Sequence, residues 1–156
     1  MVHYPNTYHI VYLYIKQNFY FLEQIWHVII QIIKADIYKS TIMKSIVKEL
    51  NDCFGSVISS INEKEEFVLY KELNLLGNYC VEHFDEQKSK EIIGKINALY
   101  EQKDLFICNA IENEFLIVLV RKFQLSQLTE QLKALPESLW AIYIKLLLET
   151  LKNDKQ

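Results

Sequence analysis

The scarcity of glycine and proline constrains this chain more than any other feature of its sequence. The 156 residues include three glycines and two prolines. An all-β sandwich or barrel needs a turn about every dozen residues, and turns depend largely on these two residue types. Half of the residues are hydrophobic, which is enough to build a core. We therefore expect an all-α fold, an irregular bundle of five to six helices.

Two unlike segments make up the chain. Residues 43–156 carry apolar residues at helical spacing, so we expect them to form the helical domain. Residues 1–42 have no clean period and hold six of the ten tyrosines and three of the four histidines. One hypothesis is that Met43 is the true start of the protein. The other is that residues 1–42 form a genuine N-terminal extension with an extra amphipathic helix.

A helical wheel supports the extra helix over residues 19–37. The polar residues in this range fall on one narrow arc, and apart from Asp36 the remainder is apolar; the arc holds Glu23, Gln24, His27, Gln31 and Lys34. We expect no membrane span, because charged residues interrupt the apolar run and a span needs roughly 20 mostly apolar residues. The segment also lacks the basic start of a secretory signal.

Periodicity in residues 43–156 predicts the individual helices. One carries Ile46, Leu50 and Phe54 on its inner face, and a second covers residues 64–84. A third follows Asp85 or Ser89 as its N-cap, and a fourth runs from the cap Asp104 to about Phe123. A short amphipathic piece starts at Ser126. After Pro136 a last helix covers residues 137–152.

The last helix has an unusually wide apolar arc. Only Ala141, Lys145, Glu149 and Lys152 mark a less apolar side. An arc this wide needs burial against other helices or against a second subunit. A homodimer through this C-terminal helix is therefore one hypothesis for the protein.

Charge and motifs exclude several classes of function. The net charge is -3, and Arg121 is the only arginine beside 16 lysines. Nucleic-acid binding is not expected from an acidic chain with so little arginine. The three isolated glycines form no phosphate-binding loop, and HExxH and GxSxG are absent. We expect no catalytic constellation, metal site or cofactor. Three separate cysteines without a CxxC pair predict reduced core thiols in a cytoplasmic protein.

Two clusters of charged residues look like helix ends. The stretch "VEHFDE" groups Glu82, His83, Asp85 and Glu86, but neighbours in sequence do not share a helix face, so a metal site there is weakly supported. The run "NEKEE" at residues 62–66 is typical of a capped, acidic helix start. We expect both clusters to be solvated.

The most informative polar residues lie in the apolar fourth helix, in "CNAIENEFL". On a wheel Asn109, Glu112 and Asn113 fall together, whereas Glu114 lies opposite and is expected to face out beside Arg121. A buried, unpaired carboxylate is costly. Glu112 would therefore join a hydrogen-bond network with the two asparagines and a Lys or Tyr of another helix, contact a partner, or act as a catalytic or ligand-binding acid. We take these three residues as candidate binding residues.

The stretches "INALYEQKDLFICNAIENEFL" and "LPESLWAIYIKLLLE" resemble small all-helical bacterial proteins of unknown function. Some of those proteins occur near polymorphic-toxin and defence genes and are regarded as immunity proteins. The resemblance covers roughly Met43 to Leu151 and carries over no functional residue. It implies a protein that binds another protein.

These observations predict a non-enzymatic protein-interaction module, with neutralisation of a toxin as one form of that function. Residues 43–156 hold 14 Lys and Arg against 18 Asp and Glu, which favours a basic partner. The alternative is a small helical enzyme or ligand-binding protein that uses an inter-helix pocket around Glu112.

Overall fold

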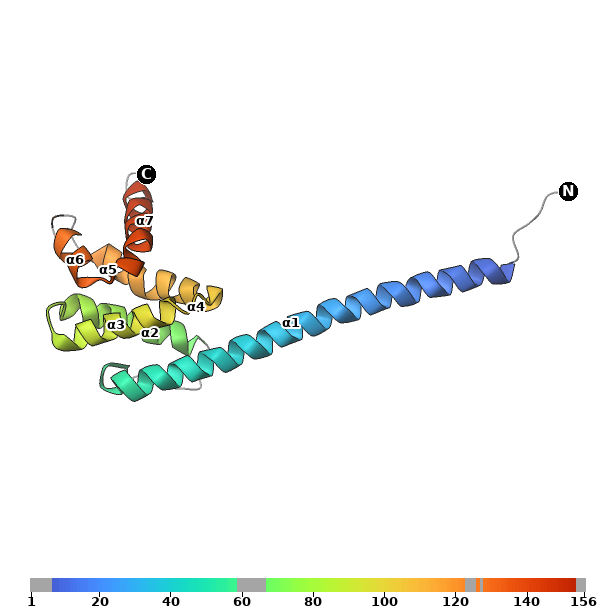
Figure 1. Ribbon diagram of the computed structural model, residues 1–156, viewed down its shortest axis with the longest axis horizontal. Coiled ribbons are helices and arrows are strands. Elements are labelled where there is room, and N and C mark those ends of the chain that lie inside the picture. Colours follow the sequence, from blue (N-terminus) through green and yellow to red (C-terminus); the bar gives the residue numbers. More distant parts are fainter. Residues whose placement is uncertain (1–6, 59–66, 123–125, 127, 154–156) are drawn as a thin grey trace. The chain divides into compact units, whose positions relative to one another are not determined.

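In the computed structural model, residues 7–58, 67–122, 126 and 128–153 are described, with side chains from residue 20 onward. The secondary structure in these ranges is helical (Figure 1), which confirms the all-α prediction. The elements are α1 (Thr7–Ile58), α2 (Val68–Glu82), α3 (Gln87–Tyr100), α4 (Leu105–Ala110), the π-helix η1 (Ile111–Leu116), α5 (Ile117–Lys122), α6 (Leu128–Ala134) and α7 (Glu137–Asn153).

The contacts divide the chain into two compact units, Met1–Ile42 and Met43–Gln156. In the first unit α1 is exposed from residue 20 to residue 41. Twelve large apolar side chains are exposed there: Tyr20, Phe21, Leu22, Ile25, Trp26, Val28, Ile29, Ile30, Ile32, Ile33, Ile37 and Tyr38. No helix among the described residues is both long and apolar enough to cross a membrane.

The second unit begins with the last turns of α1. Its inner face repeats every four residues, which is the spacing of one helix face, and buries Ile46, Leu50, Phe54 and Ile58. The helix is kinked at Phe54, where φ is -130° and ψ is 22°. The Lys88 ammonium of α3 lies 5.2 Å from the centre of the Phe54 ring and donates to the Cys53 carbonyl, which joins α3 to this turn.

Helix α2 is the centre of the second unit. It packs against η1, α5, α3 and α4, and the apolar face that it buries comprises Val68, Leu69, Leu73, Leu76 and Cys80. The same face carries Gly77, where an added Cβ would lie 3.1 Å from the Phe115 carbonyl oxygen and 3.2 Å from the Val118 Cβ. A glycine at this position lets the backbones of α2 and η1 approach closely.

The start of α2 corrects the sequence prediction, which placed it at residue 64. Phe67 has a φ of 67° and a ψ of 24°, in the left-handed region, so the helix begins after it, at Val68. A β-carbon makes that conformation unfavourable for phenylalanine, and no local sequence signal announces it. The "NEKEE" run lies outside the described residues.

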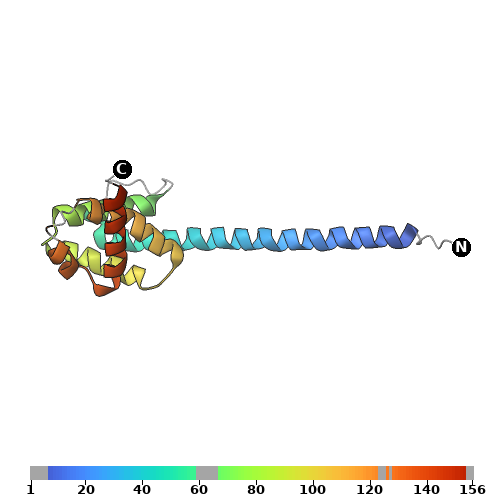
Figure 2. The ribbon, with the colours of Figure 1, turned by 90° about the horizontal axis from the view of Figure 1, so that it is seen from above.

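Helix α7 packs across α5 and η1, as Figures 1 and 2 show. Its start at Glu137, directly after Pro136, is as predicted. The inner face buries Leu139, Tyr143 and Leu146. The Tyr143 hydroxyl donates to the Gln131 Oε1 at 2.7 Å, which ties α7 to α6 and satisfies a buried carboxamide.

The cysteines only partly match the prediction of three core thiols. All three are free. Cys80 is buried, and burial raises the pKa of its thiol to about 12. Cys108 is half-buried, and its thiol lies 3.5 Å from the Tyr100 carbonyl. Cys53 is exposed, so the prediction is wrong there. The neighbouring core positions Leu50 and Phe54 face inward and leave Cys53 outside.

Replacing Gly77 by alanine should destabilise the second unit. Alanine raises helix propensity by about 1 kcal/mol. Here, however, the new methyl group would press on a backbone carbonyl and a β-carbon, neither of which can move aside cheaply. We expect a net loss of about 1–3 kcal/mol in the free energy of unfolding, measured by urea denaturation.

Gly94→Ala is the matched control, because a Cβ at this helical position meets nothing within 4 Å. It should stabilise the unit by up to about 1 kcal/mol. Equal stabilisation by both substitutions would contradict the close approach of α2 and η1.

Candidate functional site

The predicted fourth helix is present, but it contains a turn of π-helix. The side chain of Asp104 caps it, accepting hydrogen bonds from the backbone N–H groups of Phe106 at 2.9 Å and Ile107 at 3.1 Å, as expected. In η1 the backbone N–H of Ile117 bonds to the carbonyl of Glu112, five residues back instead of four. Such turns are rare and occur frequently at functional sites. The π-turn covers "IENEFL", the part of "CNAIENEFL" that holds Glu112, Asn113 and Glu114.

Glu112 lies half-buried on one side of η1 and is paired with a tyrosine of another helix. The Tyr100 hydroxyl, at the end of α3, donates to the Glu112 Oε1 at 2.8 Å. Burial, followed by this hydrogen bond, raises the pKa of the Tyr100 hydroxyl. Burial, followed by the nearby Glu112 charge, raises the pKa of the Cys108 thiol. A network with a tyrosine was one of the three predicted roles of Glu112.

The two asparagines do not join that pair. Asn109 and Asn113 are exposed, and the Asn113 carboxamide donates to the Asn109 backbone carbonyl at 2.9 Å, within their own helix. In the described part of the chain neither asparagine bonds to the Glu112 carboxylate. The wheel grouped the three residues because it assumed an uninterrupted α-helix. Their role as binding residues stays a prediction.

Glu114 lies elsewhere than predicted. It is half-buried and lines a surface cavity of about 330 Å³ together with Tyr70, Lys71, Asn74 and Leu75 of α2. Burial and then the Glu114 charge raise the pKa of the Tyr70 hydroxyl. Arg121, expected beside Glu114, is exposed. The structural reason is the π-turn, since five-residue spacing shifts the faces that a regular wheel assigns. η1 thus directs one carboxylate toward Tyr100 and the other toward Tyr70.

An aromatic row lies beside this cavity. The Phe67 and Tyr70 ring centres are 5.8 Å apart, and the Tyr70 and Phe106 rings meet edge to face at 6.0 Å. Both spacings are those of favourable aromatic pairs. Phe67 is exposed in spite of these contacts. The left-handed residue before α2 thus carries an aromatic ring that is exposed at the surface.

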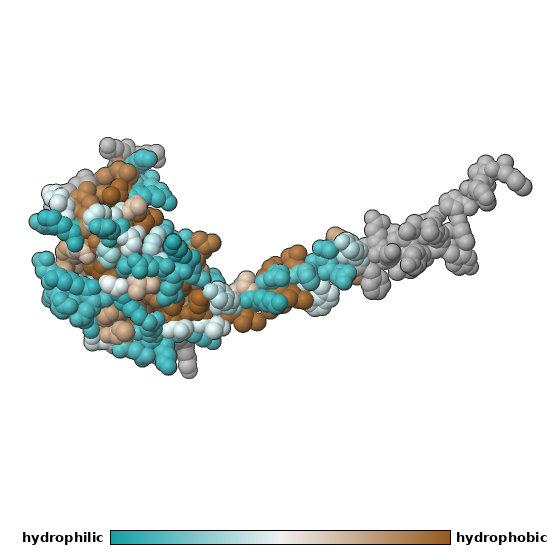
Figure 3. Space-filling model, viewed as in Figure 1, coloured by the Kyte–Doolittle hydropathy of each residue, from teal (hydrophilic) through white to brown (hydrophobic). Residues whose placement is uncertain are grey.

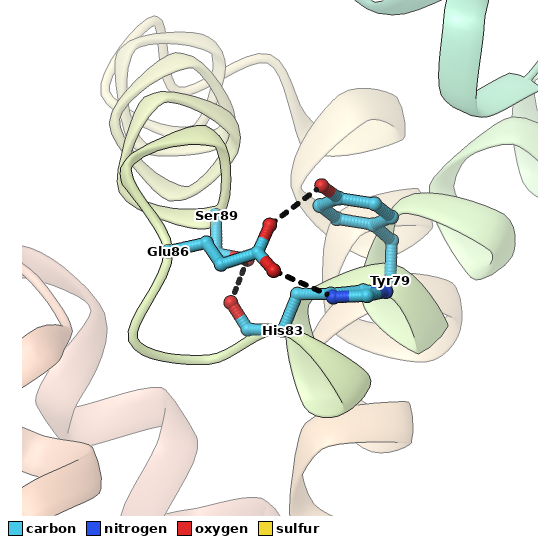
Figure 4. A network of polar contacts seen from close by, with 4 residues as sticks. All are labelled: Tyr79, His83, Glu86 and Ser89. Atoms are coloured by element: carbon cyan, nitrogen blue, oxygen red, sulfur yellow. Dashed lines mark hydrogen bonds and ion pairs between the residues drawn. The ribbon is translucent and has the colours of Figure 1, made fainter.

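The "VEHFDE" stretch forms a helix-end network, shown in Figure 4. The Glu86 carboxylate accepts from the Tyr79 hydroxyl at 3.0 Å and contacts the His83 Nδ1 at 2.9 Å, while the Tyr79 and His83 rings stack. The bond to His83, followed by that to Tyr79, lowers the pKa of Glu86. The network is exposed at the end of α2, as expected of a solvated helix end.

The start of α3 differs from the prediction. Glu86 is the N-cap residue, and neither Asp85 nor Ser89 holds that position. Ser89 is instead buried within the first turns of the helix, and its hydroxyl donates to the His83 carbonyl at 2.6 Å (Figure 4). A serine so close to a helix start resembles an N-cap in the sequence. Here its hydroxyl instead satisfies a carbonyl group at the end of the preceding helix.

A buried carboxylate of α2 was missed by the sequence analysis. Glu72 is 1 % exposed, and its Oε1 accepts a short hydrogen bond from the Asn51 carboxamide near the end of α1. In the sequence, Glu72 follows Lys71 and looks like one of many surface acids. Its position between the core residues Leu69, Leu73 and Leu76 was the signal that could have revealed it.

The described residues form an all-α domain with a π-turn at its centre. Glu112 does not line the cavity beside Tyr70. The family described as a domain of unknown function (DUF7674) matches residues 43–151, and the chain belongs to this family. No curated protein and no solved structure matches the chain.

The Tyr100–Glu112 bond should contribute measurably to stability. Tyr100→Phe and Glu112→Gln should each lower the free energy of unfolding by about 1–2 kcal/mol at neutral pH, because a hydrogen bond to a charged group is lost. A double-mutant cycle should give a coupling of about 1 kcal/mol. Additive losses would mean that the two side chains do not interact.

The pH dependence gives the same bond a second test. Because the pKa of Tyr100 is raised in the folded state, its contribution is complete below pH 10.0, the ordinary value, and is lost as the pH rises above it. The free energy of unfolding of the Tyr100→Phe variant should therefore fall less than that of the original chain over the same rise in pH.

Proposed function

We propose that residues 43–151 form a protein-binding module whose contact surface is the outer face of α7. The observation that carries this proposal is a stripe of exposed apolar residues on that helix. Trp140, Ile144 and Leu148 follow one another every four residues, with exposed fractions of 36, 39 and 53 %. They therefore lie along one line of the helix. Figure 3 shows apolar side chains gathered over α7.

The stripe is held rigidly by its surroundings. The Trp140 indole N–H donates to the Leu135 carbonyl at 2.8 Å, which fixes the orientation of its ring. The Ser138 hydroxyl bonds to the Asn97 carboxamide of α3, and the inner face of α7 is buried in the core. Rigid aromatic and aliphatic side chains bind with little loss of conformational entropy, and tryptophan is prominent among residues that dominate binding energies.

Charge supports a basic partner. The domain is acidic, and polar residues flank the stripe; Lys145 and Glu149 are exposed beside it. Complementary charge accelerates association and excludes acidic competitors. A toxin with a basic surface is a partner of this kind, and neutralisation of such a toxin is the specific form of the function that we propose. A cytoplasmic location stays a prediction from the cysteines.

A ligand-binding role for Glu112 is less well supported. Its carboxylate is engaged by Tyr100, and neither of the two surface cavities that we describe is lined by Asn109, Glu112 or Asn113. A larger cavity of about 780 Å³ lies between α2, α3 and α6, where it is lined by side chains of both charges that include Glu82, Lys90, Glu130 and Lys133. Nothing about its mixed charge selects one ligand.

The proposal is tested with the protein products of the adjacent genes as candidate partners. Each is titrated into the purified chain by isothermal calorimetry. A Trp140→Ser/Leu148→Ser variant should weaken binding at least about 30-fold, which corresponds to the loss of one residue worth about 2 kcal/mol. Raised salt should slow association.

Lys145→Gln/Glu149→Gln is the control, because it changes exposed positions of the same helix without altering the stripe. It removes one charge of each sign beside the stripe and leaves the net charge unchanged, so it should weaken binding by less than about threefold. Binding unaffected by the Trp140/Leu148 pair would remove α7 from the interface. The homodimer predicted from the sequence is a further outcome, since self-association abolished by the same pair would assign the stripe to a second copy.

A further inference from the structure

The largest apolar surface of the described chain lies on α1, in the first unit. Between residues 20 and 38 twelve large apolar side chains are exposed, among them Trp26 at 62 %. They present on the order of 1,000 Å² of apolar surface to water. The largest patch on a typical monomer is about 300–600 Å², and larger patches mark interaction sites.

The apolar surface covers most of the circumference of the helix. On a wheel with 100° per residue, Val28 and Ile30 mark the two edges of an apolar arc that is about 200° wide. The polar arc is about 100° wide and holds Glu23, Gln24, His27, Gln31 and Lys34. Two of the twelve exposed side chains, Tyr20 and Tyr38, also lie in this arc, and the other ten lie in the apolar arc. Figure 3 shows a hydrophilic band with apolar side chains on either side of it along the described part of α1. A helix that packs against one other helix buries a narrower apolar stripe than this. The α1 segment therefore has enough apolar surface to pack against two neighbouring helices.

The charges argue against a lipid surface as the occupant. Glu23 and Lys34 cancel within the polar arc, whereas helices that bind anionic membranes carry an excess of Lys and Arg there.

The same charges suit an antiparallel copy of this helix. Glu23 and Lys34 are 11 residues apart, so they lie within about 20° of each other on the wheel. An antiparallel neighbour centred between Val28 and Ile29 places Glu23 of each helix level with Lys34 of the other. A parallel neighbour would instead set each of these two charges beside its own copy. Between antiparallel neighbours the two Asp36 side chains lie about 22 Å apart along the axis, whereas those of the diagonal helices lie at one level.

We propose that residues 20–38 of α1 assemble with the same segment of three other chains as an antiparallel four-helix bundle. Each helix buries its wide apolar arc between two neighbours, and the polar arc faces water. The area available is comparable to the roughly 800 Å² that each partner contributes to a stable interface. This inference does not depend on the function proposed for residues 43–151.

Analytical ultracentrifugation of the full chain tests the assembly. We expect a species of four 18.6 kDa chains, about 74 kDa, that dissociates on dilution. Ile29→Lys, in the middle of the apolar arc, should give a monomer, whereas His27→Lys, in the middle of the polar arc, should not. The unfolding transition of the second unit should be unchanged in both variants, which shows that the domain still folds.

A charge exchange tests the antiparallel direction. Glu23→Lys and Lys34→Glu should each raise the dissociation constant at least about tenfold, because each places like charges opposite one another. The double variant, with both charges exchanged, should recover to within about threefold of the original chain.

Three results would overturn the proposal. The first is a monomer at all concentrations. The second is an oligomer that Ile29→Lys leaves intact but the Trp140→Ser/Leu148→Ser variant dissociates, which would place self-association on α7. The third is binding to phosphatidylcholine or phosphatidylglycerol vesicles that Ile29→Lys abolishes, which would assign the surface to lipid.

Discussion

The close approach of α2 to the π-turn is the constraint on which the domain depends. At Gly77 a β-carbon would be tightly packed, because it would lie 3.1 Å from the Phe115 carbonyl oxygen and 3.2 Å from the Val118 Cβ. The approach lets α2 contact η1 and α5 while its remaining surface meets α3 and α4. The π-turn in turn fixes where the two carboxylates of "IENEFL" point, one toward Tyr100 and one into the cavity beside Tyr70.

The polar groups described in the interior are largely satisfied from within the domain. Gln131 accepts from Tyr143, Ser89 donates to a backbone carbonyl, and Asn51 donates to Glu72. This is the ordinary condition of a stable core, in which each buried polar group has a partner. The outer face of α7, which we propose as a contact surface, and the ring of Phe67 are instead apolar groups that the domain leaves exposed.

Much of the fold could be predicted from the sequence because a helix depends on residues that are close together in the chain. The sequence correctly predicted three such features: the helical spacing of Ile46, Leu50 and Phe54, the cap at Asp104, and the start of α7 after Pro136. These features depend on neighbouring residues, so a single sequence contains them. The all-α class followed from the rarity of glycine and proline.

The misjudged positions depend on tertiary contacts or on rare backbone geometry. No propensity scale marks the π-turn, and a regular wheel therefore grouped Asn109, Glu112 and Asn113 while sending Glu114 outward. The left-handed Phe67 shortened α2 for a similar reason. Ser89 looks like a cap and Glu72 looks like a surface acid until the helices that cover them are known. The role of Asn109, Glu112 and Asn113 as binding residues stays a prediction, and the structure revises only which side chains of this stretch face inward.

Native-state hydrogen exchange tests the central role of the α2–η1 contact most directly. If that contact organises the domain, amides in residues 73–80 of α2 and 115–120 of η1 and α5 should exchange the slowest, at rates set by global unfolding. Amides of the short helix α6 should exchange faster through local opening. Exchange at residues 115–120 as fast as in α6 would contradict this account, because the proposed centre of the domain would then open independently of the rest.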